Sequence, residues 1–113
     1  MQEYYADLHI HIGEAAGRPV KITASRNLTL ENIILAVAPR KGLDIVGIVD
    51  AGTLPVYSEI EALLLKGDLV EVAEGGFLAR NGLLVIAGAE VESREGVHLI
   101  LYFPGLTAIK EWQ

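Results

Sequence analysis

The sequence predicts a single α/β domain in which parallel strands alternate with helices. Three observations support this class: a polar-apolar alternation at residues 4–12, helical spacing of apolar residues at 29–42 and 55–67, and a nearly all-apolar run at 43–50. Strand, helix and strand in this order predict a right-handed βαβ unit with parallel strands. The 113 residues are enough for one domain, so we expect residues 1–113 to have no internal boundary.

The first strand carries a possible metal site. From Ala6 to Ile12, polar and apolar side chains alternate strictly, so that Asp7, His9 and His11 share one face while Leu8, Ile10 and the two end residues share the other. Two imidazoles on one face can bind one metal ion, and a neighbouring carboxylate can orient a ring nitrogen. The alternative is an edge strand whose polar face is merely solvated, and the His-x-His spacing alone leaves both open.

A loop at residues 13–27 follows this strand, with glycines and a proline as breakers. Its basic residues are Arg18, Lys21 and Arg26. Their place just after the histidines suits the binding of an anionic substrate, although an ordinary solvated loop has the same composition.

Two helices with a buried strand between them come next. Thr29 is a good N-cap for the first helix, which Pro39 should kink or end and Gly42 should stop. The run at 43–50 is apolar enough for a strand covered on both faces. The second helix is expected to start near Pro55 and to close at Gly67.

The second half of the chain predicts strands joined by tight turns. Strands are expected at residues 69–72, 77–80, 83–90 and 97–103, and an amphipathic helix should begin at residue 106. Asn81-Gly82 predicts a two-residue hairpin turn. The element order is therefore β-α-β-α-β-β-β, with a helix at the end.

Potential metal ligands occur near the ends of separate strands. Asp50 and Glu90 each end an apolar strand, and His98 begins the last one. In parallel α/β folds, functional residues gather at the C-terminal ends of strands. Taken singly, Asp50 also fits a turn cap and His98 a core histidine, whereas a buried Glu90 requires a partner. Together with His9 and His11 they form a nitrogen and oxygen set suited to Zn, Mn or Fe.

Composition narrows the alternatives. There is no cysteine, which excludes thiolate sites, and the net charge of −6 argues against a broad nucleic-acid surface. No run approaches the roughly 18 apolar residues of a membrane span. The N-terminus lacks the basic start and apolar stretch of a signal peptide, so we expect a cytoplasmic protein without membrane partners.

These residues resemble the motifs of the PHP (polymerase and histidinol phosphatase) domains. The similarity lies, in order, in residues 6–11 (ADLHIH), 47–50 (GIVD), 87–91 (AGAEV) and 97–100 (VHLI). Residues 17–23, 28–32 and 40–47 further resemble the branch that contains endonuclease Q-like DNA repair nucleases. The resemblance spans essentially the whole chain.

The resemblance implies a fold and an activity. The fold is a distorted β/α barrel, of which this chain is an N-terminal portion. The activity is metal-dependent phosphoester hydrolysis, on DNA or on a small phosphate ester in the parent protein. The implied metal ligands are His9, His11, Glu90 and His98, with Glu90 bridging two ions. Asp7 and Asp50 are implied to support the ligands.

Two departures from the family pattern matter. The second motif usually reads Thr-Asp-His, but here Ala51 and Gly52 follow Asp50, and no histidine lies between His11 and His98. Later strands of the barrel, which carry further ligands in the family, are not part of these 113 residues. We therefore expect weak or partial metal occupancy and little activity from this chain alone. A non-catalytic remnant that serves as a structural or partner-binding module is the alternative.

We also expect a homo-oligomer. Half a barrel leaves a sheet edge and a sheet face uncovered, and hydrophobic residues make up 51% of the chain. Leu106, Ile109 and Trp112 form a stripe on a helix too short to be stable alone. A second copy of the chain could cover both features.

Overall fold

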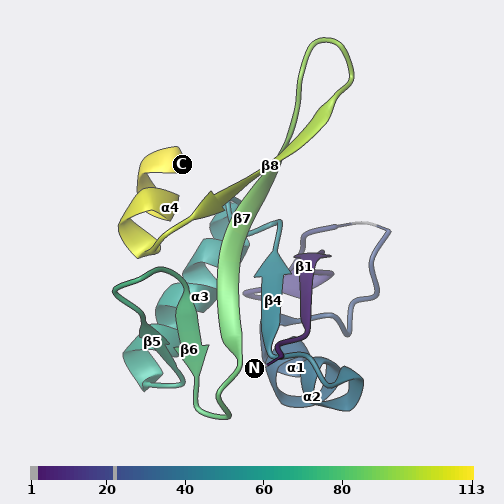
Figure 1. The fold of residues 1–113 in the computed structure, drawn as a ribbon. Helices are drawn as coiled ribbons and strands as arrows, with labels where there is room; N and C mark the ends of the chain where they lie inside the picture. Colours follow the sequence, from purple (N-terminus) through teal and green to yellow (C-terminus); the bar gives the residue numbers. More distant parts are fainter. Residues whose placement is uncertain (1–2, 22) are drawn as a thin grey trace.

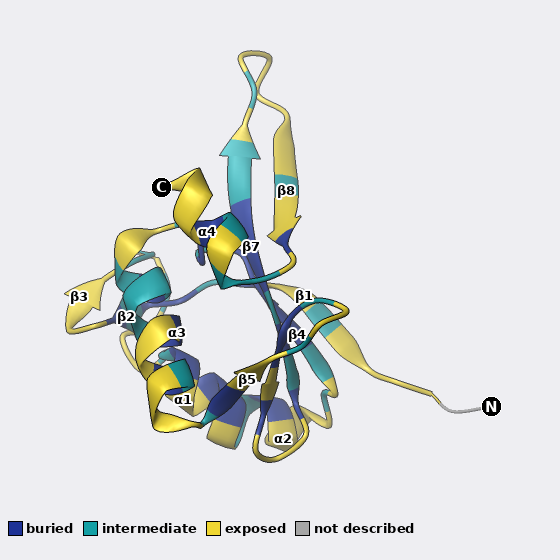
Figure 2. Cartoon of the chain, turned by 90° about the vertical axis from the view of Figure 1, so that its left-hand side faces the viewer, coloured by how far each residue is buried: buried dark blue, intermediate teal, exposed yellow. Residues whose placement is uncertain are grey.

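The computed structural model describes residues 3–21 and 23–113 and contains one mixed sheet with helices packed on one side (Figures 1 and 2). The strands of this sheet are β1 (Ala6–Ile10), β4 (Ile45–Ile48), β5 (Leu69–Glu71), β6 (Phe77–Ala79), β7 (Leu84–Glu92) and β8 (His98–Phe103). Their order is β1-β4-β7-β6-β5, and β8 pairs with β7. β1, β4 and β7 run parallel to one another, which confirms the predicted α/β class.

Helices cover the side of the sheet on which the core lies (Figure 2). They comprise α1 (Leu30–Asn32), η1 (Ile33–Val37), α2 (Ala38–Lys41), α3 (Leu54–Lys66) and α4 (Leu106–Trp112). Alternate strand residues point into this core, and Val46, Phe77 and Val85 are completely buried there. A two-stranded hairpin, β2 (Glu14–Ala15) and β3 (Arg18–Pro19), lies inside the predicted loop at 13–27.

The first helical segment begins and ends where the sequence predicts. The Thr29 side chain accepts a hydrogen bond from the backbone N–H of Asn32 over 3.2 Å, which is the expected N-cap. Gly42 ends the segment with a left-handed φ of 70°, a conformation that costs glycine little. Both ends are therefore set by local chemistry.

Pro39 does not end this helical segment, which was one of the two predicted outcomes, but the helix is distorted just before it. The turn before it widens into the π-helix η1, in which the N–H of Ala38 bonds to the carbonyl of Ile33. The same spacing would pair the carbonyl of Ile34 with Pro39, which has no N–H. The side-chain amide of Asn81 donates to the Ile34 carbonyl instead, over 2.9 Å. A distant turn thus satisfies the acceptor that the proline leaves free.

The hairpin between β6 and β7 is present, but its turn is longer than predicted. The N–H of Gly82 donates to the carbonyl of Ala79 over 3.0 Å, and the N–H of Ala79 donates to Leu83 over 2.9 Å. The loop therefore runs from Arg80 to Gly82, with Gly82 in the left-handed region at φ +90°. This is the turn-plus-bulge geometry of a three-residue hairpin loop. The prediction of a two-residue Asn81-Gly82 turn is wrong.

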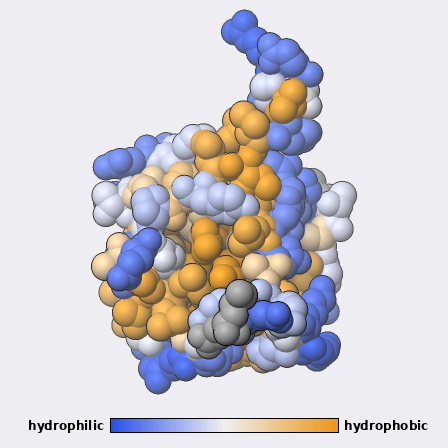
Figure 3. All heavy atoms as spheres, in the orientation of Figure 1, coloured by the Kyte–Doolittle hydropathy of each residue, from blue (hydrophilic) through white to orange (hydrophobic). Residues whose placement is uncertain are grey.

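The sheet face opposite the helices is apolar and open (Figure 3). Val70, Leu78 and Tyr102 lie on it, with 61%, 43% and 43% of their surfaces exposed. Ile86 of β7 pairs with Gly47 on the same face and is half-buried. Among the described residues, no helix covers this face (Figure 2).

None of the helices in the described part of the chain is both long and apolar enough to cross a membrane.

Candidate metal centre

The two imidazoles of the candidate centre, those of His9 and His11, lie at the C-terminal end of β1. β1 pairs with β4 in parallel, but the register shifts between Asp7 and Ile10, so the strict alternation predicted for this segment does not hold. Leu8, Ile10 and Ile12 are expected on one face, but Leu8 is 43% exposed whereas Ile10 and Ile12 are buried. His9 and His11 nevertheless lie together, with ring centroids 5.2 Å apart.

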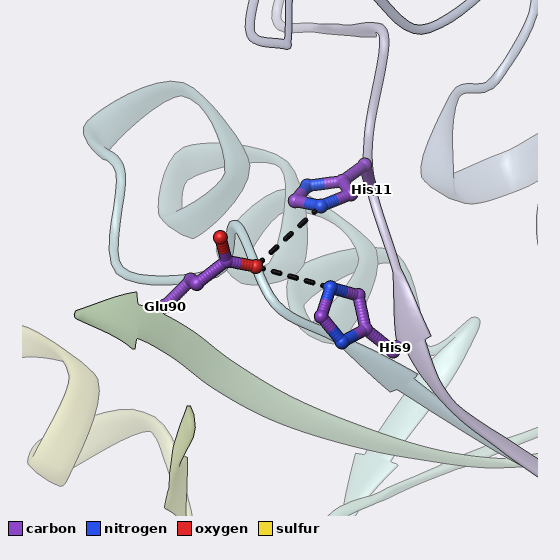
Figure 4. Close-up of side chains that lie close together, drawn as sticks. All are labelled: His9, His11 and Glu90. Atoms are coloured by element: carbon purple, nitrogen blue, oxygen red, sulfur yellow. Dashed lines mark ion pairs between the residues drawn. The ribbon is translucent and has the colours of Figure 1, made fainter. Parts of the chain in front are cut away.

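Glu90 meets both histidines from β7 (Figure 4). Its Oε2 atom lies 3.0 Å from Nε2 of His9 and 3.6 Å from Nε2 of His11. One ligand atom from each residue lies within 4.8 Å of the other two. The predicted convergence of these three side chains is confirmed, and their role as metal ligands stays a prediction.

His11 is held by a second carboxylate on its other ring nitrogen. Its Nδ1 atom lies 3.1 Å from Oδ2 of Asp50, and that same oxygen accepts the backbone N–H of Ile12 over 2.8 Å. A carboxylate on Nδ1 fixes the ring and leaves Nε2 directed at Glu90, which is the usual support for a metal-binding imidazole. The turn after β4 therefore places Asp50 where the sequence suggested a supporting role.

Asp7 has a different contact from the one predicted. Its Oδ1 atom accepts the backbone N–H of His9 over 3.1 Å. The carboxylate therefore holds the backbone of His9 beside the register shift, and the orientation of a ring nitrogen predicted for Asp7 is not what the structure shows.

His98 reaches the centre from β8 and approaches the other oxygen of Glu90. Its Nδ1 atom lies 3.3 Å from Oε1 of Glu90 and its Nε2 atom lies 4.0 Å from Oε1 of Glu92. The side chain is 60% exposed, so it is not the core histidine that the sequence left open as an alternative. Glu90 therefore has the imidazoles of His9 and His11 at Oε2 and that of His98 at Oε1.

Electrostatics keep Glu90 ionised in this setting. Partial burial raises the pKa of its carboxyl group, but the neighbouring His11, His9 and His98 lower it by more. The net pKa lies below the ordinary value of a glutamate. Glu90 is therefore a carboxylate, the form that binds metal ions.

The chemistry of the three side chains fits a divalent metal ion. Oε2 of Glu90 is buried and has no well-directed hydrogen bond among the described residues, although His9 Nε2 is only 3.0 Å away. A buried carboxylate oxygen is stabilised by positive charge, which a metal ion between this oxygen and the two imidazoles would supply. Two imidazole nitrogens and a carboxylate suit Zn, Mn or Fe.

The basic residues predicted for substrate binding lie on the loop that leads away from the centre. Arg26 contacts Glu14 at 3.4 Å, and Arg18 is exposed in β3. The backbone N–H of Lys21 donates to the carbonyl of Ile12, the residue after His11, over 2.9 Å. The structure brings none of the three into the His–Glu group.

The C-terminal helix also borders the centre, which the sequence did not indicate. The predicted stripe on α4 packs within the chain: Ile109 is completely buried, and the ring of Trp112 lies 5.8 Å from that of Phe103. The stripe therefore finds contacts within the chain itself, while Trp112 remains 47% exposed. A pocket of about 180 Å³ between Trp112 and Glu90 links the helix to the centre.

Comparison with known proteins identifies two similar chains. No family model matches the sequence. The chain is 35% identical over 118 aligned positions to the uncharacterized protein YqxK of Bacillus subtilis (strain 168), covering 99% of this chain and 30% of that protein. Its fold is similar to endonuclease Q, solved in complex with a 27-mer duplex substrate with an abasic lesion at the active site. That match has a TM-score of 0.69 and 30% identity, covering 96% of this chain and 24% of the other. The chain thus spans less than a third of either protein, and its fold is nuclease-like.

Proposed function

We propose that this chain is the metal-binding N-terminal portion of a PHP-type phosphoesterase whose substrate is a phosphodiester in DNA. The convergence of His9, His11 and Glu90 carries the proposal. Its support is the buried Oε2 atom of Glu90, which forms no well-directed hydrogen bond among the described residues, and the similarity, at 30% identity, to an endonuclease solved with duplex DNA.

Each residue has a defined part in this proposal. His9 and His11 would bind the ion through Nε2, and Glu90 through Oε2, while Asp50 keeps the ring of His11 in place. The bound ion would act as a Lewis acid on a phosphoryl oxygen and activate water for attack on phosphorus. His98 on Oε1 of Glu90 offers a further nitrogen ligand beside the first three.

The chain alone is proposed to bind one divalent ion weakly. Ala51 and Gly52 follow Asp50, so this turn supplies no imidazole, and the His–Glu group is open to water on the side of the exposed His9. An incomplete and solvated ligand set gives weak binding and slow hydrolysis.

Isothermal titration with Zn²⁺ and Mn²⁺, followed by an assay on duplex DNA with an abasic site, tests the proposal. We expect one weak site that is lost in His9→Ala, and hydrolysis close to background. Strong hydrolysis by the chain alone, abolished by His9→Ala, would show that the ligand set is complete. No metal binding would refute the proposal.

A non-catalytic role as a partner-binding module is the second candidate, and the open apolar face favours it. Val70, Leu78 and Tyr102 expose apolar surface on a sheet face that no described helix covers. Patches of this kind mark interfaces. We propose that in isolation a second copy of the chain covers this face and forms a two-fold dimer.

A further inference from the structure

The last turn of α4 lies directly on the turn that follows β4. The side-chain amide of Gln113 donates to the carbonyl of Gly52 over 2.6 Å. The indole of Trp112 packs on the same glycine, because a Cβ atom at Gly52 would lie only 2.8 Å from Nε1 of Trp112 and 3.1 Å from the Cβ of Ala89. Glycine at this position is therefore what permits the indole to approach the backbone.

This turn is tied to β7 immediately before Glu90. The N–H of Ala51 donates to the carbonyl of Gly88 over 3.0 Å, and the N–H of Glu90 donates to the carbonyl of Val49 over 3.1 Å. Within the turn, the backbone N–H and the hydroxyl of Thr53 both donate to the carbonyl of Asp50. The turn that contains Asp50 is thus tied to β7 on one side, and Trp112 and Gln113 contact it at Gly52.

We propose that Trp112 and Gln113 are positioning residues for the metal centre. Their contacts with Gly52 restrict the movement of the turn. This turn positions the carboxylate of Asp50, whose Oδ2 atom lies 3.1 Å from Nδ1 of His11 and orients its ring. The inference rests on the proposed function, because it concerns the affinity of that centre for metal. It adds a role for α4, which neither the sequence pattern nor the ligand set assigns.

The physical basis is the sensitivity of metal affinity to the groups that orient the ligands. Loss of a carboxylate that supports a ligating imidazole costs about 10- to 100-fold in affinity. A turn that is free to move by a fraction of an ångström weakens the same contact without removing it. Substitutions in α4 are therefore expected to lower metal affinity severalfold, and by no more than the loss of the carboxylate itself would.

Cobalt titration of the full 113-residue chain tests this inference with two optical signals. The d–d absorption of bound Co²⁺ reports affinity, and the emission of Trp112, the only tryptophan, reports its proximity to the ion. We expect Co²⁺ to quench the emission in parallel with the absorption. Gln113→Ala and Trp112→Leu should each weaken binding severalfold, whereas Glu111→Ala, on the exposed side of α4, should bind as the unaltered chain does.

A double variant separates positioning from a general loss of stability. Gly52→Ala should weaken binding because its Cβ displaces the indole or the turn. Gly52 and Trp112 are in contact, and the effects of substitutions at contacting residues do not add. If these two residues position the centre together, the double variant Gly52→Ala with Trp112→Leu should bind Co²⁺ no more weakly than Trp112→Leu alone. Additive losses would overturn the inference.

The outcomes for the two proposals differ. If His9→Ala abolishes Co²⁺ binding while Gln113→Ala and Trp112→Leu bind normally, the metal centre stands and the role of α4 is refuted. If the unaltered chain binds no Co²⁺, the proposed function falls and this inference falls with it. If Trp112→Leu loses its far-UV circular dichroism, it is unfolded, and the Co²⁺ affinity of Gln113→Ala alone then tests the role of α4.

Discussion

The Nε2 atom of His9 lies 3.0 Å from Oε2 of Glu90, and this contact joins β1 to β7 across the end of β4. Beyond Ile48, where β4 ends, the chain still links the two strands, because the N–H of Val49 donates to the carbonyl of Ile10 over 3.0 Å and its carbonyl accepts the N–H of Glu90 over 3.1 Å. Val49 thus ties β1 to β7 beside the candidate centre.

Removal of the carboxylate on Asp50 tests the support of His11. In Asp50→Asn the amide still accepts from Ile12, but it no longer offers a negative charge to Nδ1 of His11. We expect Zn²⁺ affinity to fall about 10- to 100-fold, measured by calorimetric titration. Asp68→Asn, which alters an exposed carboxylate that contacts Arg80, is the matched control and should leave affinity unchanged. Equal affinities for Asp50→Asn and the unaltered chain would contradict this role.

We predict that the side chain of Asn81 compensates for the hydrogen bond that Pro39 cannot donate to the carbonyl of Ile34. Asn81→Ala removes the donor to the Ile34 carbonyl, and a carbonyl left without a donor in a partly buried site costs about 1–3 kcal/mol. Urea unfolding followed by circular dichroism measures this loss. Arg80→Ala, in the same turn, removes only an exposed ion pair and should cost less than about 1 kcal/mol. A smaller loss for Asn81→Ala than for Arg80→Ala would argue against this explanation.

The open sheet face leads to a prediction about association. Light scattering at tens of micromolar should give a mass near twice 12.2 kDa. Leu78→Glu, on the open face, should shift the mass to that of a monomer, because a charge there cannot be buried unpaired. Leu65→Glu, at an 84% exposed position on α3, should leave the dimer intact. A monomer for the unaltered chain would refute the dimer.

Much of the fold follows from local signals in the sequence. The Thr29 cap, the stop at Gly42 and the parallel arrangement of the first strands depend on neighbouring residues or on the handedness of βαβ units. The same holds for the centre, since His9, His11 and Glu90 are found by asking what lies at strand ends.

The remaining features depend on contacts between distant segments. The amide of Asn81 reaches the carbonyl of Ile34, and Gln113 reaches Gly52, without any local pattern that indicates either contact. The register shift in β1 is also invisible in a sequence that alternates strictly from Ala6. Such features are determined by tertiary packing, so residue spacing alone could not predict them.

A Zn²⁺ titration of this chain beside His9→Ala and Glu90→Gln tests the central claim most directly. The account predicts one weak site in the unaltered chain and no measurable site in either variant, because each change removes one of the three ligand atoms that converge among the described residues. Both variants should keep the far-UV circular dichroism of the unaltered chain, since neither side chain belongs to the buried core. Equal Zn²⁺ binding by all three proteins would contradict the assignment of His9, His11 and Glu90 as a metal centre.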